Sequence, residues 1–352
     1  MINFNNILDM AVNKECSDIH LSVGTVVFGR INSKLEKLTN EVIGQQEIIT
    51  YAKEILGDKY GDVEKNGDID ISFSRSGLGR FRANVFKQRN SLAISIKVIS
   101  ILENNNDDFN FPNKIHEIVS SIDSGLLLIT GPVGSGKSTT ISNIIKRISE
   151  ECSKHIITIE SSIEFLYKHG NSIVNQREIY SDTNSYLSGL EAAIKENADV
   201  IFIDIIDNYD VLKMVLKCCD AGILVISTLY ANNVQDTLNN LINMDTSNAN
   251  INLRNSLSKS LKCIINQKII LDNENKNFCL FEIMINTPSI ANCIRENKIK
   301  HILLLMQNGL KLGMSTLDIS LIQAYKNSKI SRNVLLQNIS NKELATKIIL
   351  NY

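Results

Sequence analysis

Apolar and polar residues alternate with the period of a β-strand in several parts of the first hundred residues. The alternation is clearest in residues 79–89, where Phe81, Ala83 and Val85 are expected to face a core. Arg80 and Arg82 would then lie together on the opposite face, and the simplest interpretation of them is a solvated strand surface. Strands are predicted at 26–31, 68–73, 79–89 and 92–98, and one helix at 46–56. These elements indicate a small α+β unit.

From about residue 115 the pattern changes to strands and helices in alternation, which is typical of a parallel sheet. The strands are expected at 126–130, 155–159, 200–203 and 223–228, and the helices at 138–151, 185–195 and 209–219. A polar run that contains Pro112 separates the two patterns and predicts a linker. After about residue 280 the chain is expected to be helical, for example at 317–325 and 333–336. The fold class is therefore α/β, with a first domain at 1–102, a linker at 103–114, a doubly wound domain at 115–280 and a helical region at 281–352.

One decapeptide, residues 131–140, fits the phosphate-binding pattern G-x-x-x-x-G-K-[ST]. It stands between a predicted strand and a predicted helix, and a match in that position is rarely an accidental Gly/Ser turn. In such a loop the glycines let backbone N–H groups converge on phosphates, Lys137 reaches the β and γ oxygens, and the Ser138 hydroxyl ligates Mg²⁺. The residues expected to bind the nucleotide are Gly131, Pro132, Val133, Gly134, Ser135, Gly136, Lys137, Ser138 and Thr139. The sequence therefore predicts a site for a nucleoside triphosphate.

Such a loop needs acidic groups that position Mg²⁺ and polarise the attacking water. Glu160 and Glu164 follow the strand predicted at 155–159, which is expected to neighbour the strand before the loop. Each could instead be a glutamate at a helix start, stabilised by the helix dipole. Asp204 follows four apolar residues in the generic Walker B pattern, and it is the expected outer-sphere partner of Mg²⁺.

Length and composition set broad limits on these predictions. The chain has 352 residues, which suggests two domains, and its net charge of −1 gives no reason to expect nucleic acid as a partner. Its seven cysteines are scattered without C-x-x-C spacing, as in a protein with reduced thiols. No signal peptide and no apolar run of about 20 residues are evident, so a soluble, intracellular protein is expected.

Six segments in the same order resemble the PilT-type ATPases, the retraction motors of type IV pili within the secretion ATPase superfamily. The segment at 79–89 is similar to G-R-F-R-x-N-x-F-x-Q-R, and the segment at 155–165 is similar to the Asp box, I-T-I-E-D-P-I-E-F. The other similar segments are 17–22, 174–178, 286–296 and 312–318. The resemblance therefore runs nearly from end to end.

The resemblance implies a PAS-like N-terminal domain, a RecA-like ATPase domain and a hexameric ring that uses ATP and Mg²⁺. It also implies a cytoplasmic location, in peripheral association with the inner face of the cytoplasmic membrane, and an inner-membrane pilus platform protein as partner. In such motors arginines of the N-terminal domain approach the γ-phosphate. Arg82 and Arg89 are the residues expected to do so here, against the alternative of a solvated strand face.

The departures from the family pattern lie mainly at the residues expected to carry out hydrolysis. Ile205 stands where the family has the Walker B glutamate that activates water, and two serines follow Glu160 where Asp-Pro is expected. Both histidines of the family's His box are replaced, by Ile223 and Tyr230. Asp204 could substitute for the missing glutamate only where the strand ends or bulges, because consecutive strand residues point to opposite faces. Glu164 is the other group that could orient water.

Two hypotheses follow. The first is a hexameric motor that couples ATP hydrolysis to pilus retraction and twitching motility. The second is a catalytically weak or inactive ATP-binding subunit that has a regulatory or structural role in a ring, alone or with a paralogue. A third, a P-loop ATPase of DNA transport, is disfavoured by the neutral net charge and by the lack of a basic stripe.

Overall fold

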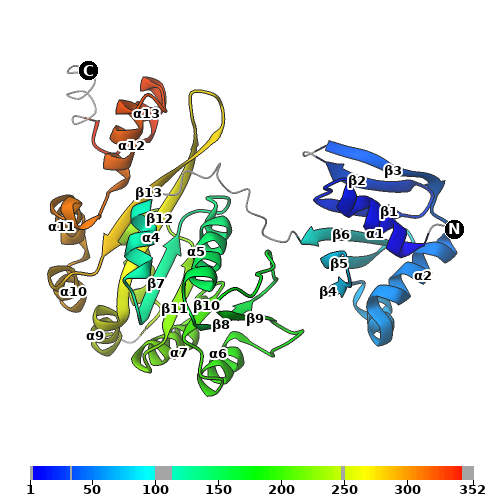
Figure 1. Ribbon diagram of the computed structural model, residues 1–352, viewed down its shortest axis with the longest axis horizontal. Helices are drawn as coiled ribbons and strands as arrows, with labels where there is room; N and C mark the ends of the chain where they lie inside the picture. The colour runs from blue at the N-terminus through cyan, green and yellow to red at the C-terminus, as the bar shows by residue number, and fades with distance from the viewer. Residues whose placement is uncertain (1–2, 32–33, 100–112, 247–249, 343–352) are drawn as a thin grey trace. The chain divides into compact units, whose positions relative to one another are not determined.

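The computed structural model describes residues 3–31, 34–99, 113–246 and 250–342. The chain divides into two compact units, the first formed by residues 1–102 with 162–166 and the second by residues 103–161 with 167–352. Residues 103–112 of the predicted linker lie outside the described residues. Both units combine helices with a β-sheet, as the α/β prediction requires (Figure 1).

The first unit contains a six-stranded antiparallel sheet in the order β3-β2-β1-β6-β5-β4. Its strands are β1 (Asp18–Ser22), β2 (Val26–Ile31), β3 (Lys34–Val42), β4 (Asp68–Arg75), β5 (Gly79–Gln88) and β6 (Ser91–Ile99). Its helices are α1 (Phe4–Asn13), α2 (Gln45–Leu56), a 3₁₀ turn (Gly57–Lys59) and α3 (Tyr60–Asn66). Helices α1 and α2 cover one face of this sheet (Figure 1).

The alternation in β5 decides which of its residues enter the core of the first unit. Phe81, Ala83 and Val85 are fully buried among residues of α1 and α2, whereas Arg80 and Arg82 remain partly exposed on the other face. Phe81 also stacks on Phe73 of β4, with 5.4 Å between the ring centroids. The predicted orientation of this strand is confirmed.

The second unit contains a seven-stranded sheet in the order β13-β12-β7-β11-β10-β8-β9. The strands are β7 (Gly125–Thr130), β8 (His155–Glu160), β9 (Ile173–Glu178), β10 (Val200–Ile203), β11 (Leu224–Leu229), β12 (Leu261–Leu271) and β13 (Asn277–Ile285). Neighbouring strands are parallel except for the antiparallel pair of β12 and β13 at one edge. The parallel sheet predicted from the alternating pattern is therefore present.

Helices cover both faces of this sheet (Figure 1). They are α4 (Asn113–Ser120), α5 (Lys137–Glu151), α6 (Tyr186–Lys195), α7 (Tyr209–Asp220), α8 (Val234–Asn243), α9 (Ile251–Ser260), α10 (Pro288–Arg295), α11 (Ile302–Asn308), α12 (Leu317–Lys326) and α13 (Arg332–Asn338), with 3₁₀ turns at Ile299–His301 and Leu310–Leu312. All six residues of β7 are buried, because Leu126 and Leu128 pack under α6–α9 while Leu127 and Ile129 pack under α4 and α5. A strand covered on both faces reads as a continuous apolar run.

Two expectations are corrected by the topology. Strand β8 does not neighbour the strand before the P-loop, since β10 and β11 lie between β8 and β7. Order along the chain does not reveal this, because β10 and β11 come later in the chain than β8 and are inserted between β8 and β7. The helical region also begins later than residue 281, because β13 continues to Ile285 in an apolar run that pairs with β12.

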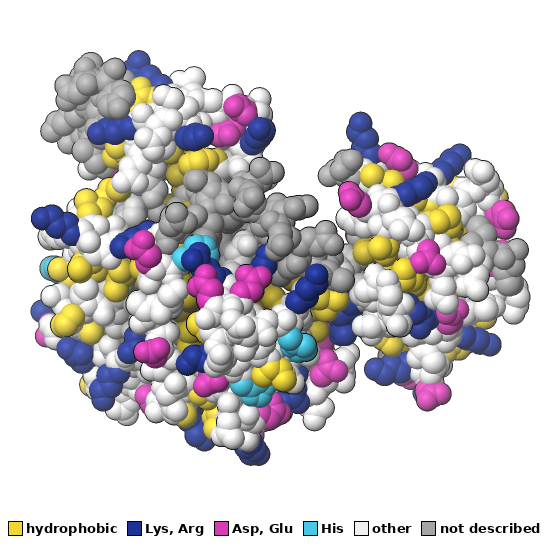
Figure 2. Space-filling view, in the orientation of Figure 1, with side chains coloured by type: hydrophobic (Ala, Val, Ile, Leu, Met, Phe, Trp, Pro, Cys, Tyr) yellow, Lys and Arg dark blue, Asp and Glu magenta, His cyan; other side chains and the backbone are white. Residues whose placement is uncertain are grey.

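Within the part of the chain that the structure describes, no helix is long and apolar enough to cross a membrane. On the face seen in Figure 2, Lys and Arg side chains are interspersed with Asp and Glu side chains, and no continuous basic surface is visible there.

Candidate nucleotide-binding site

The loop between β7 and α5 has a backbone that requires glycine. Gly131, Gly134 and Gly136 have φ angles of 149°, 77° and 84°, in the region that disfavours side chains. A Cβ atom on Gly131 would lie 2.4 Å from the carbonyl oxygen of Gln267 in β12. The loop therefore packs directly on β12 at Gly131, and glycine is needed there for that approach.

The Lys137 side chain turns back over this loop. Its ammonium Nζ donates to the carbonyl oxygens of Gly131 at 3.0 Å and Pro132 at 2.8 Å. An ammonium has three donors, so one remains for a phosphate oxygen. Burial lowers the pKa of Lys137, as expected for a cation partly withdrawn from water.

The first turn of α5 is open to a ligand. Gly136 is the N-cap residue, no side chain caps the helix, and Ser138 in the first turn is exposed. The first N–H groups of a helix lack partners within the helix and attract anions. The residues present therefore fit a phosphate group, and the Ser138 hydroxyl is accessible to a metal ion.

Two adjacent amides of β12 hold the loops that flank this site, and both are fully buried. Gln267 Nε2 donates to the carbonyl oxygen of Ser135 at 2.7 Å. Asn266 Nδ2 donates to Thr130 Oγ1 at 2.9 Å and to the carbonyl oxygen of Ala231 at 3.1 Å. The sequence analysis missed both residues, although two amides that follow the apolar run at residues 263–265 were a usable signal.

Glu282 of β13 is a further polar group that the sequence analysis missed. It pairs with Asn266 in the strand register, is 4% exposed, and accepts the N–H of Val234 at 2.8 Å at the start of α8. Burial is the main cause that raises the pKa of Glu282 to about 7. A single acid within the apolar run of β13 was the available signal.

The two acids predicted in this unit, Glu160 and Asp204, both accept hydrogen bonds from residues in β8 or directly after it. Asp204 Oδ2 accepts the N–H of Ser161 at 2.7 Å and its hydroxyl at 2.6 Å. Burial, together with the nearby Asp204 carboxylate, raises the pKa of Tyr186. Glu160 is buried and accepts from Thr158 Oγ1 at 2.6 Å. Strand β10 ends at Ile203, so Asp204 is free of the strand alternation, but its carboxylate is turned to β8 and not to β11.

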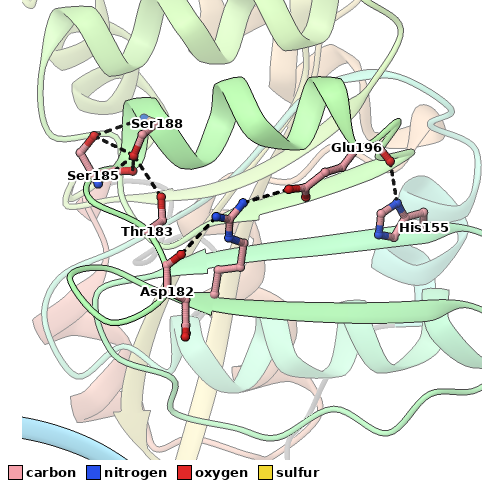
Figure 3. Close-up of polar contacts among 7 residues, drawn as sticks. His155, Asp182, Thr183, Ser185, Ser188 and Glu196 are labelled. Atoms are coloured by element: carbon pink, nitrogen blue, oxygen red, sulfur yellow. Dashed lines mark hydrogen bonds and ion pairs between the residues drawn. The ribbon is translucent and has the colours of Figure 1, made fainter.

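Within the motif at 174–178, Arg177 has a structural explanation in the contacts between β9 and α6, and Figure 3 shows its partners Glu196 and Asp182. Arg177 donates to Glu196 Oε1 and to the carbonyl oxygen of Asp182, both at 3.1 Å, while Glu196 O contacts His155 Nδ1 at 3.2 Å. Ser185 caps α6 by accepting the N–H of Ser188 at 3.2 Å. These contacts tie the edge strand β9 to α6.

The remaining predicted residues, Arg82, Arg89 and Glu164, belong to the first unit, whereas the P-loop belongs to the second. Arg82 Nη2 lies 3.4 Å from Asp70 Oδ2, and Arg82 is opposite Lys97 in the strand register. Arg89 is exposed in the β5–β6 turn, and Glu164 is also exposed. Their role in catalysis stays a prediction.

Comparisons with known proteins agree with this geometry. The family model described as type II/IV secretion system protein matches residues 85–341. The type IV pilus retraction ATPase PilT of Pseudomonas aeruginosa is 30% identical over 94% of this chain and 96% of its own length. The twitching motility protein of Neisseria gonorrhoeae is 29% identical over 89% of this chain and 84% of its own length. The crystal structure of the pilus retraction motor PilT with bound ADP matches with a TM-score of 0.88 at 32% identity, over 99% of this chain and 100% of that one.

Proposed function

The chain belongs to the type II/IV secretion system protein family, and from this premise we propose that it is a motor subunit that couples ATP hydrolysis to retraction of a type IV pilus. The observation that carries the proposal is the match of nearly the whole chain, both units included, to an ADP-bound retraction motor. The open phosphate loop at 131–140 supports it independently, because it supplies the binding chemistry that such a motor needs.

The proposed division of work within the site follows from its contacts. Lys137 keeps two donors on its own loop and gives the third to the phosphates, and Gln267 holds the loop from below. Ser138 would hold Mg²⁺, with Asp204 as the outer-sphere partner. The metal would neutralise charge on the phosphate oxygens.

The hydrolytic step is where this chain differs from a fully equipped motor. Ile205 has no proton acceptor, and Asp204 is held by Ser161 on the β8 side of β10. Loss of a general base typically slows a reaction by about 10²–10⁴-fold. This observation favours a second candidate function, a subunit that binds ATP and hydrolyses it slowly within a ring of its own copies or of paralogues.

Assembly completes the proposal. We propose a hexameric ring on the cytoplasmic face of the inner membrane, docked on a pilus platform protein. In that ring Arg82 and Arg89 would approach the γ-phosphate, and Glu164 would orient the attacking water. Nucleic acid is not an expected partner, because the net charge is −1.

Steady-state phosphate release with Mg-ATP tests the function, together with the affinity for ATP. The variant Lys137→Ala should abolish phosphate release and ATP binding. Lys213→Ala, which removes an exposed lysine of α7, should change neither the release rate nor the affinity. Turnover that disappears in Lys137→Ala supports the motor. Binding without turnover in the wild type supports the slowly hydrolysing subunit, and unchanged turnover in Lys137→Ala would refute the assigned site.

A further inference from the structure

Tyr230 lies beside the phosphate-binding lysine, although it follows β11 whereas Lys137 follows the loop after β7. Strand β11 pairs with β7 so that Leu229 is opposite Thr130, and the loops that follow both strands leave the sheet at the same edge. The centroid of the Tyr230 ring is 4.6 Å from Lys137 Nζ, within the range of a cation–π contact. Tyr230 is 54% exposed, so much of the residue faces water.

The Tyr230 ring partly balances the positive charge of the Lys137 ammonium, which has few other groups to balance it. Two donors of Lys137 reach neutral carbonyl oxygens, and burial alone accounts for its lowered pKa, with no carboxylate of the described residues acting on it. An aromatic face attracts such a cation, and the attraction is weak where the ring is exposed. A phosphate oxygen forms a stronger, charge-assisted bond with the same ammonium.

Hydrogen bonds hold the backbone around Tyr230 in place, whereas the residue itself is largely exposed. Asn240 Nδ2 donates to the Tyr230 carbonyl oxygen at 3.3 Å, and Asn266 Nδ2 donates to the next one, of Ala231, at 3.1 Å. The Val234 N–H is bound by Glu282 at 2.8 Å. A movement at this point is therefore expected to be a side-chain rotation and not a loop displacement.

We propose that Tyr230 is a displaceable cover of the Lys137 ammonium: its ring holds this ammonium, and the phosphates of a bound nucleotide displace the ring. This inference rests on the proposed nucleotide site and adds a residue that sets its affinity. On this proposal the ring and the phosphates compete for the same ammonium, so binding breaks the contact. A contact that must be broken lowers the apparent affinity by the factor with which it favours the covered state.

Equilibrium titration of the full chain with fluorescent ADP and Mg²⁺ tests the proposal. Tyr230→Ala should bind about two- to fivefold more tightly than the wild type, the factor that corresponds to an exposed cation–π contact. Tyr230→Phe keeps the ring and should fall well short of that gain. Tyr180→Ala removes a tyrosine that is 86% exposed and should leave the affinity unchanged.

Each other result has a definite meaning. An unchanged or weaker affinity of Tyr230→Ala would overturn the proposal, because the ring would then be irrelevant or would remain in place with the nucleotide. A weaker affinity of Tyr230→Phe would overturn it as well, because the hydroxyl would then contact the phosphates. Lys137→Ala distinguishes a failure of the Tyr230 proposal from a failure of the nucleotide site on which it rests. If Lys137→Ala binds ADP as tightly as the wild type, the nucleotide site itself is refuted, whatever Tyr230→Ala shows.

Discussion

Replacing Glu282 with glutamine should stabilise the protein at pH 8 far more than at pH 5. The pKa of the native carboxyl is raised from an ordinary value of 4.5 to about 7, mainly by burial. Between these values the native state holds more protons than the unfolded state, so the free energy of unfolding falls as the pH rises. The full shift corresponds to about 3 kcal/mol, of which about 2.5 kcal/mol is lost between pH 5 and pH 8. Glutamine removes this loss and keeps an oxygen that can accept the N–H of Val234.

The assay is urea denaturation followed by circular dichroism, at pH 5 and pH 8, for the wild type and Glu282→Gln. Any fixed cost of the new amide is the same at both pH values, so the prediction concerns the change in the difference between the two proteins. Glu191→Gln, on the exposed side of α6, is the matched control and should show no such change. Parallel stability curves for the wild type and Glu282→Gln would refute the argument from burial.

Three further predictions test contacts of the same unit. Gly131→Ala places a Cβ 2.4 Å from the Gln267 carbonyl oxygen at a φ of 149°, so the affinity for ADP should fall roughly tenfold or more in a nucleotide titration; an unaltered affinity would argue against the loop geometry. Gln267→Leu leaves the Ser135 carbonyl oxygen unpaired and should lower the free energy of unfolding by about 1–3 kcal/mol in urea denaturation, whereas a neutral effect would mean that water replaces the amide. Asp204→Asn and Ser161→Ala should couple by about 1 kcal/mol in a double-mutant cycle of stabilities, and additive effects would show that the contact contributes nothing.

The parts of this protein that could be predicted are those encoded within a few consecutive residues. The P-loop was recognisable because its glycines, Lys137 and the flanking strand and helix form one uninterrupted segment. The strand at 79–89 was recognisable because Phe81, Ala83 and Val85 alternate with charged or polar residues. In both cases the local pattern alone determines the backbone and its buried face.

The parts that escaped prediction depend on contacts between distant segments. Gln267 contacts Ser135 across 132 positions of the chain, and Asn266 contacts Thr130 across 136, so no window of the sequence shows them together. The neighbours of β8 were predicted wrongly for the same reason, because strand order depends on the path of the crossovers. The orientation of Asp204 also follows from a partner, Ser161, that only the sheet brings beside it.

The adjacent positions of Asn266 and Gln267 have a consequence for insertions and deletions. Neighbouring residues of a strand point to opposite faces, so one amide serves the loop after β11 and the other serves the P-loop. A slip of one residue in β12 would bring Ile265 or Lys268 to one of these two positions and the wrong amide to the other. The register of Asn266 and Gln267 in β12 is therefore constrained, whereas the turn between β12 and β13, at residues 272–276, lies beyond both amides and is expected to accept added residues.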